Sequence, residues 1–306
     1  ITDCTSAGAN LAVELIEPCP GGNVVFDEMA YPSAVYPWML PPRAHIERRF
    51  VKQRDGLTHL DDLAQAIDDN TLAVSISHVS ERTGFRHDLG AVAGLAHERG
   101  APLIVDAMQA TGALRIDVHE EDVDFLTSGA VKWLLGAPGV GFFYAARRHL
   151  DRMPPHAGAP GAMKDQRPWG LRDFQPRPEA EHFQIGMPNI LGMAATRPGL
   201  ELLAEVGMDT VEPHILDLSG YCIAGLRERG LPVLTPEKAE HRAGIVAMDM
   251  EDCVEAFEFL CGRGIDICPA ALTLWVDTLR LDAHVFNNHQ DIDRFMAELD
   301  AYLALR

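Results

Sequence analysis

The chain has 306 residues and a formal net charge of −19, because 45 acidic residues outnumber 26 basic ones. With 47% hydrophobic and 23% charged residues it can bury a sizeable core, which excludes a wholly disordered chain. Its thinly spread basic residues argue against nucleic-acid binding, which needs clustered lysine and arginine to neutralise phosphates. The most apolar stretch, 125–146, is interrupted by Lys132, Pro138 and four glycines, so we expect no membrane-spanning segment.

The predicted elements of the first two thirds alternate short apolar runs with helical periodicity, which indicates βαβ units and a mostly parallel sheet. Thr58 is the predicted N-cap of a helix whose apolar positions run from Leu60 to Ile67. A second helix is expected over 89–99, with Asp88 as its cap and Gly100 as its end. Strands are expected at 24–26, 72–76, 103–105, 123–126 and 139–144.

Residues 153–177 are rich in Pro, Gly, Arg and Trp without periodicity, and predict a long loop. Beyond Asn189 helical patterns dominate, and strands then recur between helices. We therefore predict a large domain over residues 1–190 and a small α/β domain over residues 191–306. The elements expected in the second are helices at 200–206, 215–226, 254–263 and 292–303, and strands at 245–248, 265–267 and 279–281.

The six cysteines include no Cys-x-x-Cys pair and are too few for a disulfide scaffold. The start of the chain lacks the basic and apolar regions of a secretory signal. These features predict a reducing, cytoplasmic location. Since Ile1 begins within a segment that is already patterned, we also expect the chain to be a fragment of a longer protein.

Two ionisable residues occupy positions suited to chemistry. Asp106 directly follows the strand 103–105, and open α/β sheets bind ligands at the carboxyl ends of their strands. A helix cap would explain this carboxylate equally well. Lys132 lies among small and apolar residues. Such a lysine either extends to the surface or occupies an apolar site that favours the neutral, nucleophilic amine, and the local sequence leaves both open.

Five segments, in their order along the chain, carry a resemblance to a known family. Together they resemble the class V aminotransferases, a family of pyridoxal-phosphate enzymes. The resemblance extends over nearly the whole chain. It implies the α/β architecture called fold-type I, with a mostly parallel sheet of the seven-stranded type in a large domain and a small C-terminal α/β domain. The segments are Ser77–Gly84 (SHVSERTG), Val105–Gln109 (VDAMQ), Lys132–Gly139 (KWLLGAPG), Phe183–Asn189 (FQIGMPN) and Arg280–Asn287 (RLDAHVFN).

The resemblance implies pyridoxal 5'-phosphate as cofactor and assigns roles to matching residues. Lys132 matches the lysine that forms the Schiff base and moves the α-proton of the substrate. Asp106 matches the carboxylate that keeps the pyridine nitrogen protonated, so that the ring is an electron sink. Gln109 matches the partner of the phenolic oxygen. Arg280 matches the clamp on the substrate carboxylate, which a planar guanidinium holds in two parallel hydrogen bonds.

Further positions match the surroundings of the cofactor. Thr5 and Ser6 match a loop that holds the phosphate at a helix N-terminus, where free amide groups point outward. Ser128 is another candidate for the phosphate. Tyr31 stands where relatives stack a histidine on the pyridine ring, and a phenol can stack there too, although a surface aromatic is the alternative. His78 is expected either to contact the cofactor region from a strand end or to be structural.

Three positions depart from the family pattern. Glu81 replaces an asparagine that often touches the cofactor, Val131 replaces a histidine beside the lysine, and Met187 replaces a threonine that reaches the phosphate of the neighbouring subunit. The resemblance also implies a homodimer. These departures motivate the alternative that the chain is a non-catalytic relative used for binding or assembly.

We predict an enzyme that acts on a small amino acid as a transaminase, an epimerase or a carbon–sulfur lyase. A kynureninase-like hydrolase and a cysteine desulfurase remain alternatives. A desulfurase needs a thiolate on a mobile loop, whereas the compact segment 265–279 before Arg280 contains only Cys268. Cysteine is often a small buried residue, so persulfide formation on Cys268 is disfavoured. No metal site is predicted.

Overall fold

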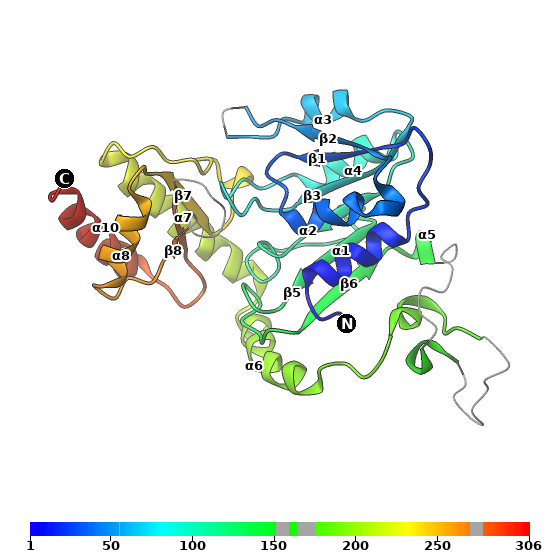
Figure 1. Cartoon of the computed structure of the whole chain (residues 1–306). Coiled ribbons are helices and arrows are strands. Elements are labelled where there is room, and N and C mark those ends of the chain that lie inside the picture. The colour runs from blue at the N-terminus through cyan, green and yellow to red at the C-terminus, as the bar shows by residue number, and fades with distance from the viewer. Residues whose placement is uncertain (55, 151–158, 165–174, 270–277) are drawn as a thin grey trace.

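A computed structural model describes the chain except for residues 55, 151–158, 165–174 and 270–277. Most of the loop predicted at 153–177 therefore lies outside the described residues. The described part forms two sheets with helices around them, a large one built from the first half of the chain and a small one near the C-terminus (Figure 1).

The large sheet has six strands in the order β2-β1-β3-β4-β5-β6. The first five are parallel and β6 is antiparallel to β5, so the expected mostly parallel α/β sheet is confirmed, with six strands in the described residues. The edge strand β2 was not predicted, because its charged side chains mask the apolar pattern. The strands are β1 (Asn23–Asp27), β2 (Glu47–Val51), β3 (Thr71–Ser77), β4 (Leu103–Asp106), β5 (Phe125–Gly129) and β6 (Gly141–Ala145).

Helices cover both faces of this sheet. Side chains alternate along each strand, so Phe26 and Ile104 pack beneath α1 (Thr5–Glu14) and α2 (Pro32–Val35). Val25 and Val105 face the other layer, formed by α3 (Leu60–Ala66) and α4 (Leu89–His97). Asp106 lies two residues beyond Ile104 and therefore points to the α1 and α2 side. A short helix, α5 (Arg147–Leu150), follows β6.

Of the two predicted helix N-caps, the one at Asp88 is confirmed and the one at Thr58 is not. Asp88 accepts a backbone hydrogen bond from the first turn of α4, and Gly100, with φ +73°, follows the end of that helix as expected. The predicted Thr58 cap of α3 is wrong, because His59 precedes the helix. Instead, the Thr58 hydroxyl donates to Asp27 Oδ2 at 2.7 Å. A buried carboxylate at the end of β1 therefore takes the hydroxyl that the local pattern assigned to the helix.

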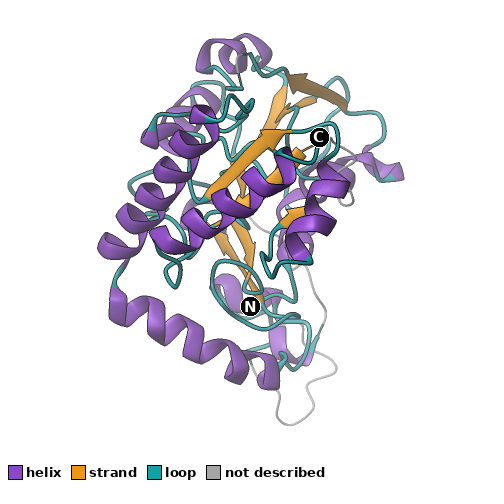
Figure 2. Ribbon diagram, turned by 90° about the vertical axis from the view of Figure 1, so that its left-hand side faces the viewer, coloured by secondary structure: helices purple, strands orange, loops and turns teal. Residues whose placement is uncertain are grey.

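The small domain is an antiparallel sheet, β7-β9-β8, with its helices packed against one face. Figure 2 views the molecule from the side of this domain. Its core contains Leu218, Leu260 and Phe295. The strand predicted at 265–267 is displaced, since pairing begins only at Cys268. The elements are α6 (Ile190–Val206), α7 (Met208–Glu228), β7 (Ile245–Asp249), α8 (Cys253–Cys261), β8 (Cys268–Pro269), β9 (Thr278–Asp282) and α10 (His289–Leu303), and short 3₁₀ helices occur at Tyr36–Met39, Pro41–Arg43, Pro160–Ala162, Glu179–Phe183 and Ala239–His241.

The long helix α7 belongs to both cores. Val211 and Ile215, near its start, pack with the large sheet, whereas Leu218 and Leu226 pack in the small domain. One rigid helix thus connects the two units, and the boundary at residue 190 stays a prediction. Within the described part of the chain, no helix combines the length and the apolar character that crossing a membrane requires.

Candidate active site

A cavity of about 140 Å³ opens at the carboxyl ends of β3 and β4. Parallel strands present their carboxyl ends at one edge, and the turns that follow them supply the walls of the cavity. Seven of the ten predicted site residues line it, although they come from five separate segments. These are Thr5, Ser6, Tyr31, Glu81, Asp106, Gln109 and Lys132.

Asp106 lies on the floor of the cavity and is almost fully buried. Its Oδ2 accepts a hydrogen bond from the Ser33 hydroxyl at 3.1 Å, and its Oδ1 accepts one from the Met108 amide at 2.9 Å. Burial raises the pKa of this carboxyl, which these hydrogen bonds and the positive charge of Lys132 only partly offset. A cation at this point of the cavity would stabilise the carboxylate, and a protonated pyridine nitrogen is such a cation.

Gln109 presents an unused donor to the cavity. Trp133 Nε1 is a donor only and bonds Gln109 Oε1 at 3.0 Å, which directs the amide Nε2 away from the tryptophan. No described residue accepts from that buried Nε2. Leaving a buried donor unpaired costs about 1–3 kcal/mol, so an acceptor atom on a bound ligand would stabilise the site. A phenolic oxygen fits this requirement.

The turn that carries Lys132 is held by contacts on both sides of it. The Val285 amide donates to His284 Nδ1, so the proton of this neutral ring is on Nε2, which donates to the Trp133 carbonyl at 2.8 Å. Burial lowers the pKa of His284 and favours this neutral form. Gly112, with φ +92°, runs so close that a Cβ would lie 2.2 Å from the Trp133 carbonyl oxygen. Only glycine allows that approach.

Glu81 lies between the two cations that the chemistry requires. Its Oε1 is 3.6 Å from Lys132 Nζ and 3.5 Å from an Arg280 NH1 that also donates to the Glu81 carbonyl at 2.9 Å. Arg280, 5% exposed, further pairs with Asp282 Oδ2 at 2.8 Å. Arg280 therefore reaches the site through Glu81, and a substrate carboxylate that binds this guanidinium competes with an acid already in place.

Besides Arg280, two predicted residues lie outside the lining of the cavity. Ser128 is fully buried and shares a hydrogen bond with Thr111 at 2.5 Å, so its hydroxyl is engaged elsewhere. His78 is buried, and its desolvation lowers its pKa to about 3, which makes it a neutral ring. Neither residue is part of the lining of the cavity.

Sequence reasoning missed Ser33 and Ser77, both of which line the cavity. Ser77 lies beside Asp106 in the β3–β4 register, and its hydroxyl accepts the Tyr31 amide at 3.3 Å. The alternation of side chains along β3 could have identified Ser77, because it ends a buried strand next to the strand of Asp106. Nothing local distinguishes Ser33, whose role depends on how α2 packs on the sheet.

Cys268 lies opposite Arg280 in the pairing of β8 with β9. Partial burial raises the pKa of its thiol, which keeps it protonated and a poor nucleophile. Among the residues that the structure describes, no group of three or more His, Cys, Asp and Glu side chains could hold a metal ion.

This fold and cavity define a class of enzyme in which a lysine beyond the carboxyl edge of a mostly parallel sheet holds a pyridoxal phosphate. Residues 1–268 match the model of the aminotransferase class V family, and the chain belongs to that family, whose members are pyridoxal-phosphate enzymes. The predicted family and cofactor are thereby confirmed. The unpaired Gln109 amide, the buried Asp106 and the nearby Lys132 amine fit this cofactor.

The chain is similar to a probable cysteine desulfurase of Halalkalibacterium halodurans, with 29% identity over 293 residues. The alignment covers 92% of this chain and 70% of the relative. It is also 28% identical to an uncharacterized aminotransferase, YcbU of Bacillus subtilis. This alignment covers 91% of this chain and 72% of the relative.

A cysteine desulfurase from Thermococcus onnurineus NA1 has a similar structure, with a TM-score of 0.88 and 23% identity over 100% of this chain and 79% of that one. The cysteine desulfurase CsdA from Escherichia coli also has a similar structure, with a TM-score of 0.84 and 21% identity. The match covers 99% of this chain and 78% of that one. At these identities the two structures establish the fold.

Proposed function

We propose that the protein is a carbon–sulfur lyase that acts on a small sulfur-containing amino acid of the cysteine type. The supporting observation is the convergence of Lys132, Asp106 and Gln109 on one cavity in a chain whose relatives include cysteine desulfurases. Of the three chemistries expected from the sequence, carbon–sulfur cleavage is the one that these relatives favour over transamination and epimerisation.

When bound, pyridoxal phosphate supplies an electron sink that stabilises negative charge at the α-carbon of the substrate. Lys132 would provide the amine that holds its aldehyde carbon and would act as the base for the α-proton of the substrate. Asp106 would keep the ring nitrogen protonated, and Gln109 Nε2 would donate to the phenolic oxygen.

Other residues hold the outer parts of cofactor and substrate. Thr5 and Ser6 line the cavity at the N-terminus of α1, where free backbone amides and the helix dipole favour a phosphate. Tyr31 also lines the cavity and supplies an aromatic face for the pyridine ring. Arg280 binds the substrate carboxylate by exchanging its contact with Glu81.

The fate of the sulfur is argued from Cys268, the cysteine that lies opposite Arg280. Cys268 is in a strand and its thiol pKa is raised, so this side chain is a poor acceptor for sulfur. We therefore propose β-elimination, in which L-cysteine and one water give sulfide, pyruvate and ammonia. A desulfurase would instead form alanine and leave sulfane sulfur on the protein.

The test uses the protein with added pyridoxal phosphate. We expect a visible absorption band that borohydride fixes to the chain, and we expect Lys132→Ala to abolish it, while the exposed Lys238→Ala serves as a control. Addition of L-cysteine is expected to yield sulfide and pyruvate in equal amounts. A band that persists in Lys132→Ala, or no band at all, rejects the proposal and favours a non-catalytic relative.

Product analysis distinguishes carbon–sulfur cleavage from the competing reactions. Racemised cysteine indicates an epimerase, amino transfer to a keto acid indicates a transaminase, and alanine released from an aromatic γ-keto amino acid indicates a kynureninase-like hydrolase. Alanine from cysteine together with protein-bound sulfur indicates a desulfurase.

We also propose a cytoplasmic homodimer. Large apolar side chains are exposed around the start of α6, among them Met187 at 86% and Leu191 at 84% exposure, together with Ile185 and Ile190. Contiguous exposed apolar surface of this kind marks an interaction site. The cysteines are all free thiols, which fits a reducing compartment. Sedimentation analysis is expected to give a dimer that Leu191→Asp weakens, and a fully active monomer contradicts this proposal.

A further inference from the structure

A second cavity, of about 330 Å³, lies between the two domains and shares no lining residue with the first. Met29, Gln53 and Arg82 line it from the large domain, and Leu234 and Thr278 line it from the small domain. A cavity of this size can hold a small metabolite.

Three polar side chains of this cavity, those of Gln53, Arg82 and Thr278, have side-chain groups without a partner among the described residues. The Thr278 side chain is 5% exposed, and no described residue bonds its hydroxyl. The buried Gln53 Nε2 is likewise unpaired. The Arg82 guanidinium forms no ion pair and no hydrogen bond among the described residues. Since buried polar groups are nearly always hydrogen-bonded, the buried Gln53 amide and Thr278 hydroxyl, beside the half-buried Arg82, indicate a missing acceptor.

The charges around the cavity limit what that acceptor can be. Arg82 is the cation in the described part of the wall, and it attracts a negative group. Two acids lie nearby: Glu28, whose Oε1 accepts the Gln53 backbone amide at 2.6 Å, and Asp249, which pairs with Thr278 across β7 and β9. One cation near two acids favours a singly charged group over a doubly charged phosphate. A carboxylate also matches the planar fork of a guanidinium.

We propose that this interdomain cavity binds a small carboxylate, held by Arg82, Gln53 and Thr278. The ligand contacts segments that also form the active site, because Arg82 follows Glu81 and Thr278 lies two residues before Arg280 on the same face of β9. Because its contacts come from both domains, the ligand stabilises their packing and raises the melting temperature of the protein.

The test titrates the full chain, with pyridoxal phosphate bound, with acetate and succinate at constant ionic strength, and follows the melting temperature and the heat of binding. We expect saturable binding of the carboxylates. Arg82→Gln and Thr278→Val are each expected to weaken it about tenfold or more, since each removes a hydrogen bond to a charged group. The exposed Arg197→Gln removes the same charge on α6 and is expected to leave binding unchanged.

Arg82→Gln is also expected to leave the melting temperature of the ligand-free protein unchanged, because its guanidinium contacts no described partner. No saturable binding, or equal binding by wild type and Arg82→Gln, overturns the proposal. Phosphate binding that is insensitive to Arg82→Gln and lost when pyridoxal phosphate is added locates the anion in the active site, and also overturns it. The titration needs no turnover, so it is independent of the proposed lyase activity.

Discussion

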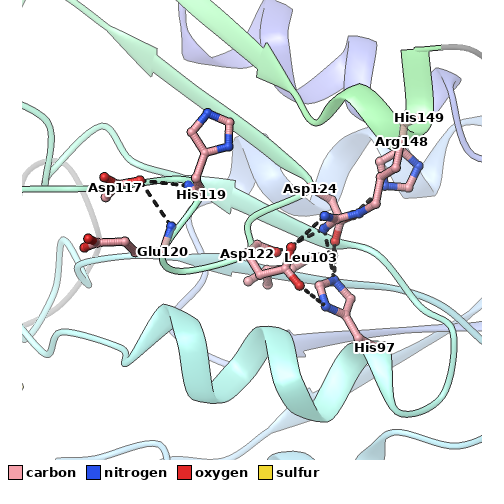
Figure 3. Close-up of polar contacts among 9 residues, drawn as sticks. All are labelled: His97, Leu103, Asp117, His119, Glu120, Asp122, Asp124, Arg148 and His149. Atoms are coloured by element: carbon pink, nitrogen blue, oxygen red, sulfur yellow. Dashed lines mark hydrogen bonds and ion pairs between the residues drawn. The ribbon is translucent and has the colours of Figure 1, made fainter.

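Asp124 immediately precedes β5, and its buried carboxylate ties four segments together (Figure 3). It accepts hydrogen bonds from the Leu103 amide at 2.8 Å, from His97 Nε2 at 2.6 Å, from Arg148 Nε at 2.8 Å and from the ring of His149. Burial alone would raise the pKa of this carboxyl, but the hydrogen bonds from His149 and His97 lower it to about 2. Since Leu103 begins β4, this cluster supports the strand that carries Asp106.

The pKa of Asp124 sets a pH dependence of stability. A shift from 3.8 to about 2 in a side chain that is 1% exposed corresponds to about 2 kcal/mol of unfolding free energy. Because the folded-state pKa is depressed, this stability is present above about pH 4 and is lost as the pH falls toward about 2. About half of it, roughly 1 kcal/mol, is lost by about pH 3.

The assay is urea unfolding followed by circular dichroism between about pH 3 and pH 7, the range in which this carboxyl begins to titrate. Asp124→Asn is expected to be less stable than wild type near neutral pH, and its unfolding free energy should fall by about 1 kcal/mol less on acidification. Asp122→Asn, at an exposed neighbour, is the control and should follow the wild type. An Asp124→Asn variant that loses stability as steeply as wild type refutes the reasoning.

Three further predictions concern the active site. Gly112→Ala forces a Cβ against the Trp133 carbonyl at positive φ and is expected to lower the free energy of unfolding by more than about 1 kcal/mol. The control Gly94→Ala places its Cβ in open space in α4 and should be neutral or stabilising. Equal effects of the two substitutions would contradict this prediction. Trp133→Phe frees Gln109 to rotate and should weaken cofactor binding, measured from the visible band, with an unchanged affinity arguing against the contact. Cys268→Ala should leave sulfide release intact, and its loss would restore the persulfide hypothesis.

Much of the central site could be predicted from local sequence. Asp106 directly follows the short apolar run 103–105. Such a run predicts a buried parallel strand, and the residue after it therefore lies at the carboxyl end of that strand. The two-residue repeat of β4 further fixes the side of the sheet to which Asp106 points. The family motifs predicted Lys132 and Gln109, and the structure brings both to the same cavity.

The failures have one physical origin, which is competition between local and distant partners. Thr58 can cap a helix, but the buried Asp27 takes its hydroxyl. Ser128 is close in sequence to Lys132, but its strand directs it to Thr111. In each case the neighbouring sequence suggested one role for the hydroxyl, and tertiary packing gave it a different, buried hydrogen-bond partner.

By itself, the sequence determined the α/β class, the family and the residues able to carry the chemistry, because periodicity and short motifs depend on neighbours in the chain. The tertiary structure alone decided what those residues face. Glu81 meets Arg280 across 199 positions, and Arg82 and Thr278 meet at one cavity from different domains. Such contacts arise when two cores pack against each other. This packing is driven by the total apolar area that is buried, which depends on many residues together and not on any single position.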